Sequence, residues 1–457
     1  MRTGQLLPQL FSKPANGRPS ARRLENGSRV AVMGGGPAGS FFSYFLLDLA
    51  ERLGMELKVD IYEPRDFSLP APQGCNMCAG VISETLVQNL AAEGINLPDS
   101  VVLRAINSYV LHSDLGSQRL DAVSREKRIA ATFRGGGPRG IREVKFLSLD
   151  AHLLSLARSK GATVVPSRVT GVERIDECLL IKSREGIREY DLLVVAAGVN
   201  TAALKLFEEI DSKYVPPKTT KTAIRDYSLN REISDQYFGD SLHVFLLDIH
   251  RLDFAMIVPK NDYVSVCMLG KDIDDNLIEA FLTHPVVKSC FPEGWRWNEP
   301  DCQCLPRINI QAAIKPYGNR IVFIGDSGVS RLYKDGIGTA YKAAKAAATC
   351  ALLQGISADD FKRFYAPFCR NLDLDNHFGR LIFLVTHIFQ HVRFARKAML
   401  EMVAAEQLSL GLSPRMSSVL WDTFTGSAPY KDVFFHTLHP AFLSRFAWGL
   451  VRSTIGS

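Results

Sequence analysis

Short strand-like runs rich in apolar residues recur along the first three quarters of the chain. They lie at 30–33, 57–62, 191–197 and 321–324, and each is followed at once by glycine or by an acidic residue. Continuous apolar runs of this kind are typical of buried parallel strands. The pattern therefore predicts an α/β fold in which the chain visits one parallel layer three times, near 30–63, 191–198 and 321–340.

The remainder of the chain follows two other patterns. Residues 200–308 are dominated by strand-like segments with turn signals between them, which favours a second lobe built on an antiparallel sheet. Beyond about residue 356 the pattern is helical. Apolar residues there recur at helical spacing and predict a stripe that faces a core; they are Phe378, Leu381, Val385, Ile388, Val392 and Met399.

The first apolar run leads into a glycine-rich turn. Gly34, Gly36 and Gly39 form Gly-x-Gly-x-x-Gly with Pro37 and Ala38 inside it, and a predicted helix follows to residue 52. Such a turn lets a diphosphate approach the N-terminus of the helix. Glu63, which ends the next predicted strand, is placed to bind ribose hydroxyls. The alternative is a glycine turn in another α/β protein, but this context favours a dinucleotide site.

The segments at 191–198 and 321–340 carry further candidate residues for binding the dinucleotide. The run at 191–197 ends in Ala197 and Gly198, whose small size leaves room for a nucleotide. The run at 321–324 ends in Gly325 and Asp326, a carboxylate placed to hold polyol hydroxyls. An Ala-rich helix follows after Gly336, Ile337 and Gly338, and its N-terminus would stabilise negative charge.

Composition and charge narrow the functional class. The chain has 457 residues, 46% of them hydrophobic, and a net charge of +6, which is too small an excess to indicate nucleic-acid binding. Its nine cysteines lack framework spacing and indicate a reducing compartment, so a cytoplasmic location is expected. No run of apolar residues is long enough to predict a transmembrane helix. Residues 1–27 are read as a flexible leader, with an organelle transit peptide as the alternative.

Cys75 and Cys78 form a Cys-x-x-Cys motif ahead of a predicted helix that begins near Ser83. Three interpretations stay open. The pair could be a redox dithiol, because a helix N-terminus lowers the pKa of a thiol. It could be half of a zinc site completed by Cys302 and Cys304. The favoured interpretation is a loop whose small side chains line a ligand pocket.

Three further features have both a functional and an ordinary explanation. The glycine-rich loop with Arg134 and Arg139, and with Arg142 close behind, could close over an anionic ligand or lie exposed in solvent. His387 and His391 have the spacing of metal ligands, but the absence of an evident third ligand favours a solvated polar face. The basic, aromatic segment 440–455 could lie at a membrane interface or dock on its own protein.

Together these segments resemble the flavoprotein superfamily that includes p-hydroxybenzoate hydroxylase and the geranylgeranyl reductases, over roughly residues 28–355. The resemblance implies a Rossmann-like FAD-binding domain formed discontinuously by 28–105, 145–205 and 309–355. It also implies an antiparallel β-sheet substrate domain formed by 106–144 and 206–308. The C-terminal helical region covers 356–457. The segment 191–198 lacks the usual Asp-Gly ending of the superfamily motif, because Val199 follows Gly198.

The resemblance also implies the cofactor contacts. Gly34, Gly36, Pro37, Ala38, Gly39, Glu63 and Arg65 correspond to the ADP side of FAD. Ala197 and Gly198 correspond to the middle strand motif, and Gly325 and Asp326 to the motif whose carboxylate contacts the ribityl or ribose region. Gly336, Ile337 and Gly338 are similar to the segment that lies against the isoalloxazine ring.

Within this superfamily the geranylgeranyl reductases are the closest likeness. Their cysteine-containing segment is similar to 75–83, and their Tyr-x-Trp-x-Phe-Pro-Lys strand resembles 254–260. Phe254, Met256 and Val258 replace Tyr, Trp and Phe, so a reshaped apolar pocket is expected. The segment 294–300 resembles the Trp-x-Trp-x-Ile-Pro motif of flavin halogenases, but Glu299 replaces the apolar residue, and halogenation is therefore not favoured.

The resemblance implies an FAD-dependent oxidoreductase that reduces C=C bonds of a prenyl or lipid-like substrate. The electron donor would be NAD(P)H or a ferredoxin-type protein, and Cys75, Cys78 or the flavin would supply the proton. Phe254, Met256 and Val258 would line the substrate site, and the C-terminal tail would contact the membrane. The alternatives are an NAD(P)H- and O2-dependent monooxygenase and a non-enzymatic electron carrier or thiol sensor.

Overall fold

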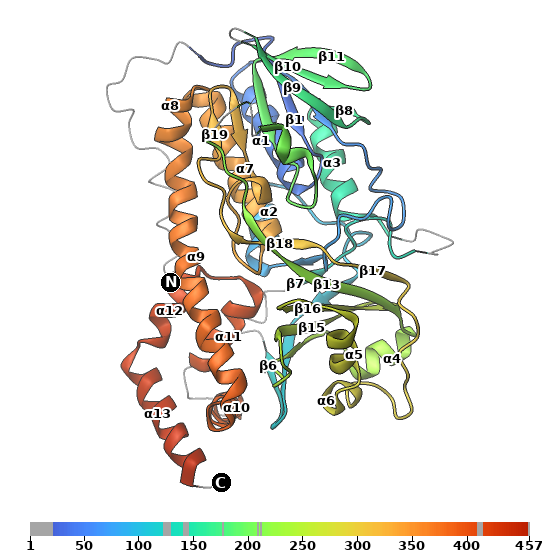
Figure 1. Ribbon diagram of the computed structural model, residues 1–457, viewed down its shortest axis with the longest axis vertical. Coiled ribbons are helices and arrows are strands. Elements are labelled where there is room, and N and C mark those ends of the chain that lie inside the picture. The colour runs from blue at the N-terminus through green and yellow to red at the C-terminus, as the bar shows by residue number, and fades with distance from the viewer. Residues whose placement is uncertain are drawn as a thin grey trace.

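The computed structural model describes residues 22–121, 129–139, 146–175, 178–207, 210, 213–408 and 415–455. The predicted leader thus lies mostly outside the described residues, as does Arg142. The described chain forms a parallel layer, an antiparallel sheet and a group of C-terminal helices (Figure 1). This confirms the predicted fold class.

The first large sheet contains the four predicted apolar runs. All its neighbouring strands are parallel except at the edge, where β19 is antiparallel to β20. Met33 is in register with Val195, and Val195 with Phe323, so the ends of three distant segments lie side by side. In sheet order the strands are β19 (Tyr317–Gly318), β20 (Ile321–Phe323), β12 (Leu192–Val195), β1 (Arg29–Met33), β2 (Lys58–Tyr62) and β8 (Thr163–Val165).

Both faces of this sheet are covered, which explains its continuous apolar runs. Val30 and Val32 face a helical layer, whereas Ala31 and Met33 face a small antiparallel sheet. The helices are α1 (Pro37–Arg52), α2 (Glu84–Ala92), α3 (Leu149–Ser159) and α7 (Gly336–Leu353). The small sheet consists of β9 (Val169–Ile175), β10 (Cys178–Ser183) and β11 (Gly186–Tyr190).

The second large sheet is antiparallel apart from its β14–β5 pair. One face packs on α4 (Arg231–Tyr237), α5 (Asp275–Leu282) and α6 (Pro285–Lys288). Its strand order is β17 (Cys302–Cys304), β13 (Lys218–Ser228), β16 (Tyr263–Gly270), β15 (Leu252–Lys260), β14 (Ser241–Phe245), β5 (Ser108–Ser113) and β6 (Gly116–Asp121), and β18 (Arg307–Gln311) also pairs with β13.

A short three-stranded sheet lies between the two predicted domains. It joins β3 (Val81–Ile82), β7 (Ile129–Ala131) and β4 (Arg104–Ile106). The predicted boundary at 105/106 assigns β7 to the substrate domain and β3 to the cofactor domain, although these strands pair. The division into domains stays a prediction.

The C-terminal region is helical, and α10 and α11 pack on the other face of the second sheet. No helix among the described residues combines the length and the apolar character needed to cross a bilayer. The helices are α8 (Ala358–Asp360), α9 (Ala366–His391), α10 (Arg393–Leu408), α11 (Arg415–Thr425), α12 (Tyr430–Thr437) and α13 (Pro440–Ile455).

The prediction of a core-facing apolar stripe on α9 is wrong. Leu381, Val385 and Ile388 are 40%, 41% and 53% exposed, and Leu384 beside them is also exposed. Only Met399, on the next helix, is fully buried. Periodicity identifies a face of a helix but does not show what covers it, and here the neighbouring helices approach from other sides.

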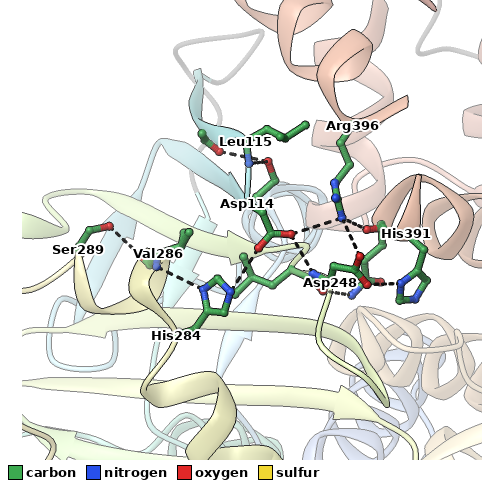
Figure 2. A network of polar contacts seen from close by, with 12 residues as sticks. Asp114, Leu115, Asp248, His284, Val286, Ser289, His391 and Arg396 are labelled. Atoms are coloured by element: carbon green, nitrogen blue, oxygen red, sulfur yellow. Dashed lines mark hydrogen bonds and ion pairs between the residues drawn. The ribbon is translucent and has the colours of Figure 1, made fainter. Parts of the chain in front are cut away.

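A polar network fastens this helical region to the antiparallel sheet (Figure 2). Arg396 on α10 is buried and contacts Asp114 and Asp248 at 3.4 and 3.7 Å. Asp114 also contacts His284 at 3.3 Å, and Asp248 contacts His391 at 2.5 Å. The two histidines that have the spacing of metal ligands contact different acids. His391 pairs with Asp248, whereas His387 lies 3.8 Å from Asp253.

We expect Arg396→Met to destabilise the protein by about 2 kcal/mol, because it leaves two aspartates without their buried cation. Urea unfolding would measure this change. The matched control is Arg393→Met, which removes an exposed arginine from the same helix. Equal unfolding midpoints for the two variants would contradict the structural role of Arg396.

Candidate functional site

The glycine turn brings the segment at 30–63 into contact with the segment at 191–198. Gly34 has φ +110°, and a β-carbon there would lie 2.5 Å from the carbonyl oxygen of Ala196. A β-carbon on Gly39 would lie 1.9 Å from the carbonyl oxygen of Gly34. Gly36 is the N-cap of α1, and no side chain caps this helix. The turn therefore presents an open helix N-terminus of the kind that binds anions.

The segment at 321–340 packs against the same glycine turn. Gly325 has φ +59°, and a β-carbon there would lie 2.8 Å from the β-carbon of Ala38. The backbone N–H of Gly198, next to Ala197, donates to Ser327 Oγ at 2.9 Å. The structure thus brings the predicted glycines of all three segments to one place.

Glu63 is buried and already bound within the chain. Its Oε2 accepts from the Gly35 N–H at 2.9 Å, and its Oε1 accepts from the backbone and Nε of Arg65, both at 3.0 Å. A carboxylate can accept further hydrogen bonds. Binding of a ribose by Glu63 and Arg65 therefore stays a prediction that these contacts permit.

Sequence reasoning missed a polar relay that continues from Arg65. Its guanidinium donates to Asn76 Oδ1 at 3.0 Å, and Asn76 Nδ2 donates to Asp150 Oδ1 at 2.8 Å. Asn76 Nδ2 would also lie 3.1 Å from a β-carbon on Gly36. The relay connects the glycine turn to the cysteine loop. Asn76 lies inside the Cys-x-x-Cys motif, and this position was the one signal in the sequence that pointed to the relay.

Arg134 ends this relay in a buried ion pair with Asp150. Burial opposes its charge, but Asp150 and then Cys78 raise the pKa of Arg134 above its ordinary value. Arg134 was predicted to belong to a loop over an anionic ligand, and the structure instead buries it against an acid. Arg139 belongs to the same loop, and its role over an anionic ligand stays a prediction.

The cysteines of the motif are free and half-buried. Cys75 Sγ accepts from the Met77 N–H at 3.2 Å, and burial raises the pKa of Cys75. A raised pKa keeps the thiol protonated at neutral pH, which disfavours a reactive thiolate. Among the described residues, the only group of three side chains arranged closely enough to hold a metal lies elsewhere, so the geometry does not support zinc at Cys75, Cys78, Cys302 and Cys304.

That group is His112, His243 and Cys290, buried between the second sheet and α6. His112 Nε2 and His243 Nδ1 are 2.9 Å apart, a hydrogen-bond distance shorter than the roughly 3.3 Å between two nitrogens on one tetrahedral zinc. Burial lowers the pKa of His112 to about 4 and that of His243 to about 3. We interpret the pair as neutral imidazoles that share a structural hydrogen bond.

Two carboxylates, those of Asp326 and Asp335, lie near the start of α7. Asp335 is its N-cap, with φ 56°, and accepts from Ser83 Oγ at 3.0 Å. A β-carbon on Gly338 would lie 2.3 Å from Asp335 Oδ1, and one on Gly336 would lie 3.9 Å from Asp326 Oδ1. Burial raises the pKa of both Asp326 and Asp335. The predicted segment of Gly336, Ile337 and Gly338 therefore opens a helix beside Asp326.

The predicted substrate residues alternate on β15 and share one face of the second sheet. Val258 is fully buried, whereas Phe254 and Met256 are half-buried. All three belong to the apolar cluster formed with α10 and α11, and the Phe254 and Phe424 rings stack with centroids 6.2 Å apart. Of the three predicted substrate residues, Phe254 and Met256 are thus the accessible ones.

Lys334 is a second residue that sequence reasoning missed. Its Nζ lies 4.2 Å from the centroid of the Phe254 ring and donates to the carbonyl of Phe424 at 3.2 Å. Burial and the nearby Arg331 lower the pKa of Lys334 to about 7. Its position directly before Asp335 and Gly336 was visible in the sequence, but nothing there showed that aromatic rings from β15 and α11 would enclose it.

Comparisons with known proteins show which fold this is. No protein-family model and no curated protein matches the chain. A geranylgeranyl bacteriochlorophyll reductase-like protein from Thermoplasma acidophilum has a TM-score of 0.62 at 14% identity, over 91% of this chain and 99% of that one. A p-nitrophenol 4-monooxygenase from Pseudomonas putida has a TM-score of 0.57 at 14% identity, over 89% and 99%.

A halogenase variant solved in complex with FAD is similar as well, with a TM-score of 0.57 at 11% identity over 94% of this chain and 91% of that one. The chain has the p-hydroxybenzoate hydroxylase-like flavoprotein fold. A reductase-like protein, a monooxygenase and a halogenase share this fold, so the fold by itself assigns no reaction to this chain.

The lowered pKa of the half-buried Lys334 predicts how stability depends on pH. An unfolded lysine has a pKa near ~10.4, whereas the folded value is about 7. Between these values the unfolded chain binds more protons, so the free energy of unfolding of the wild type rises with pH. We expect the stability of Lys334→Met relative to the wild type to fall by roughly 4 kcal/mol between pH 6 and 10.

Urea unfolding at several pH values would measure this difference. Lys342→Met, which changes an exposed lysine on the helix that follows Lys334, is the control and should differ from the wild type by a constant amount. Parallel stability curves for Lys334→Met and the wild type would show that Lys334 keeps an ordinary pKa.

Proposed function

We propose that this chain binds FAD and acts as a flavin-dependent oxidoreductase. The observation that carries the proposal is the convergence of Gly34, Ala196, Ala38 and Gly325 in front of the uncapped N-terminus of α1. A diphosphate needs close backbone approach and unpaired N–H groups, and this turn offers both. The residues present therefore fit the cofactor that the fold implies.

The proposed contacts follow from the positions of the three segments. Gly34, Gly36, Pro37, Ala38 and Gly39 would hold the diphosphate, and Glu63 with Arg65 the ribose. Asp326 would accept from polyol hydroxyls, and Ala197 and Gly198 would leave room beside them. Gly336, Ile337 and Gly338 would lie against the ring system, where the N-terminus of α7 favours negative charge.

We propose further that the reaction is reduction of a C=C bond in a prenyl or other lipid-like substrate. Bound FAD, once reduced, supplies hydride to an alkene carbon. The chain orients the substrate along the apolar face formed by Phe254 and Met256, with Val258 buried behind them. The fold shared with a geranylgeranyl reductase-like protein supports this proposal. The electron donor would be NAD(P)H or a ferredoxin-type protein.

Contact with a membrane would bring such a substrate to the site. The exposed apolar stripe of α9 adds to the basic, aromatic helix α13, on which Leu443 and Trp448 are exposed. An amphipathic surface of this kind binds at the headgroup level of a bilayer. Peripheral membrane association therefore belongs to the same proposal.

A monooxygenase is the second candidate, favoured by the equally extensive match to a p-nitrophenol 4-monooxygenase. It would use NAD(P)H and O2 on the same scaffold. The third alternative, an electron carrier or thiol sensor, requires a reactive thiol at Cys75 or Cys78. The raised pKa of Cys75 disfavours that thiol in such a role.

An anaerobic experiment separates the two enzymatic functions. The bound flavin would be reduced with dithionite, mixed with a panel of prenyl lipids and followed by its absorbance. We expect reoxidation of the flavin together with formation of a saturated lipid. Flavin that is reoxidised only by O2, with a hydroxylated product, would establish the monooxygenase instead.

A further inference from the structure

Lys334 is held at a junction of three elements. It is the last residue before the N-cap of α7, and its Nζ lies 4.2 Å from the Phe254 ring on β15 and 5.0 Å from the Phe424 ring on α11. Its hydrogen bond to the Phe424 carbonyl is 3.2 Å long. The ammonium group is thus fixed between the helix that would face the flavin and the strand that would face the substrate.

Among the described residues, no acidic side chain pairs with the ammonium group of Lys334. Within the described ranges, no carboxylate oxygen lies within ion-pair distance of it. The nearest charged neighbours on its own segment are Arg331 and Asp335. Arg331 is engaged by the carbonyls of Gly426 and Ala428, and Asp335 by Ser83. Asp253 on β15 lies instead 3.8 Å from His387.

These surroundings set the acidity of the group. Cation–π contacts and a carbonyl stabilise an ammonium less than a carboxylate would, and burial disfavours it. The pKa of Lys334 is accordingly lowered to about 7, close to the value that suits proton transfer at neutral pH. Burial instead raises the pKa of Cys75 and makes that thiol a weaker acid.

We infer that Lys334 is the catalytic acid of the substrate site, donating the proton that completes reduction of the alkene. The inference rests on the proposed function. Lys334 takes the role of proton donor that the sequence had assigned to Cys75 or Cys78. Its ammonium group lies against Phe254, which is an accessible member of the proposed substrate residues on β15.

Hydride supplied by the reduced flavin, which would be oxidised in the step, would form a C–H bond at one alkene carbon, and the π electrons would form a second C–H bond at the other carbon with the proton of Lys334 Nζ. The electron pair of the broken N–H bond stays on nitrogen, which becomes a neutral amine enclosed by two rings. Solvent then returns a proton to the amine before the next turnover.

The test compares Lys334→Met and Lys334→Gln with the control Lys342→Met in the FAD-loaded protein. Flavin absorbance and dithionite reduction report folding and cofactor binding, and should be unchanged in all three variants. We expect alkene saturation to fall at least about 100-fold in both Lys334 variants, the usual effect of removing a general acid. The wild-type rate should decline as pH rises through 7, and this limb should be absent in the variants.

A second readout does not depend on activity. Acetic anhydride labels neutral amines, so labelling of Lys334 measured by peptide mass spectrometry against pH reports its pKa directly. A midpoint near 7 in the FAD-loaded wild type is expected. A midpoint near ~10, the ordinary lysine value, would overturn the assignment.

The outcomes separate this inference from the proposed function. If the wild type saturates none of the lipids, the proposed function fails and the alkene step fails with it. If the wild type is active and both Lys334 variants keep its rate within threefold, only the assignment of Lys334 is overturned. Loss of activity in Cys75→Ala or Cys78→Ala, but not in Lys334→Met, would also overturn it and assign the proton to a thiol.

Discussion

The architecture depends on close contacts at three glycines. Gly34 meets Ala196, Gly39 meets Gly34, and Gly325 meets Ala38, each at a distance that leaves no room for a β-carbon. These contacts pull together segments almost three hundred residues apart and leave the N-terminus of α1 open. Because the parallel sheet is covered on both faces, its ends are where a ligand can approach, and the glycine contacts lie at those ends.

The sequence predicted these features because each depends on local chemistry. The glycine turn, the apolar strands and the acid at 326 each follow from residues adjacent in the chain, and the predicted α/β fold class was confirmed. What failed depended on distant partners. The periodicity on α9 identified the face that carries Leu381, Val385 and Ile388, yet that face is exposed.

The polar chemistry of the site was equally hidden from the sequence. Asn76, Arg134 and Asp150 become a relay only when the cysteine loop folds against Gly36, and Lys334 comes to lie between two aromatic rings only when β15 and α11 pack beside it. Residue identity gives the donors and acceptors, whereas burial sets their pKa. The same dependence on burial changes the interpretation of Cys75, from a candidate thiolate to a weak acid.

The most direct test of the central claim is whether purified protein holds FAD at the glycine turn. Wild-type protein and Gly449→Ala, where an added β-carbon would meet only ordinary contacts of 3.4 Å or more, should both show the absorbance spectrum of a bound flavin. Gly36→Leu should be folded but lack that spectrum, because its side chain would meet Asn76 and occupy the space of the diphosphate. An intact flavin spectrum in Gly36→Leu would contradict the assignment of this site.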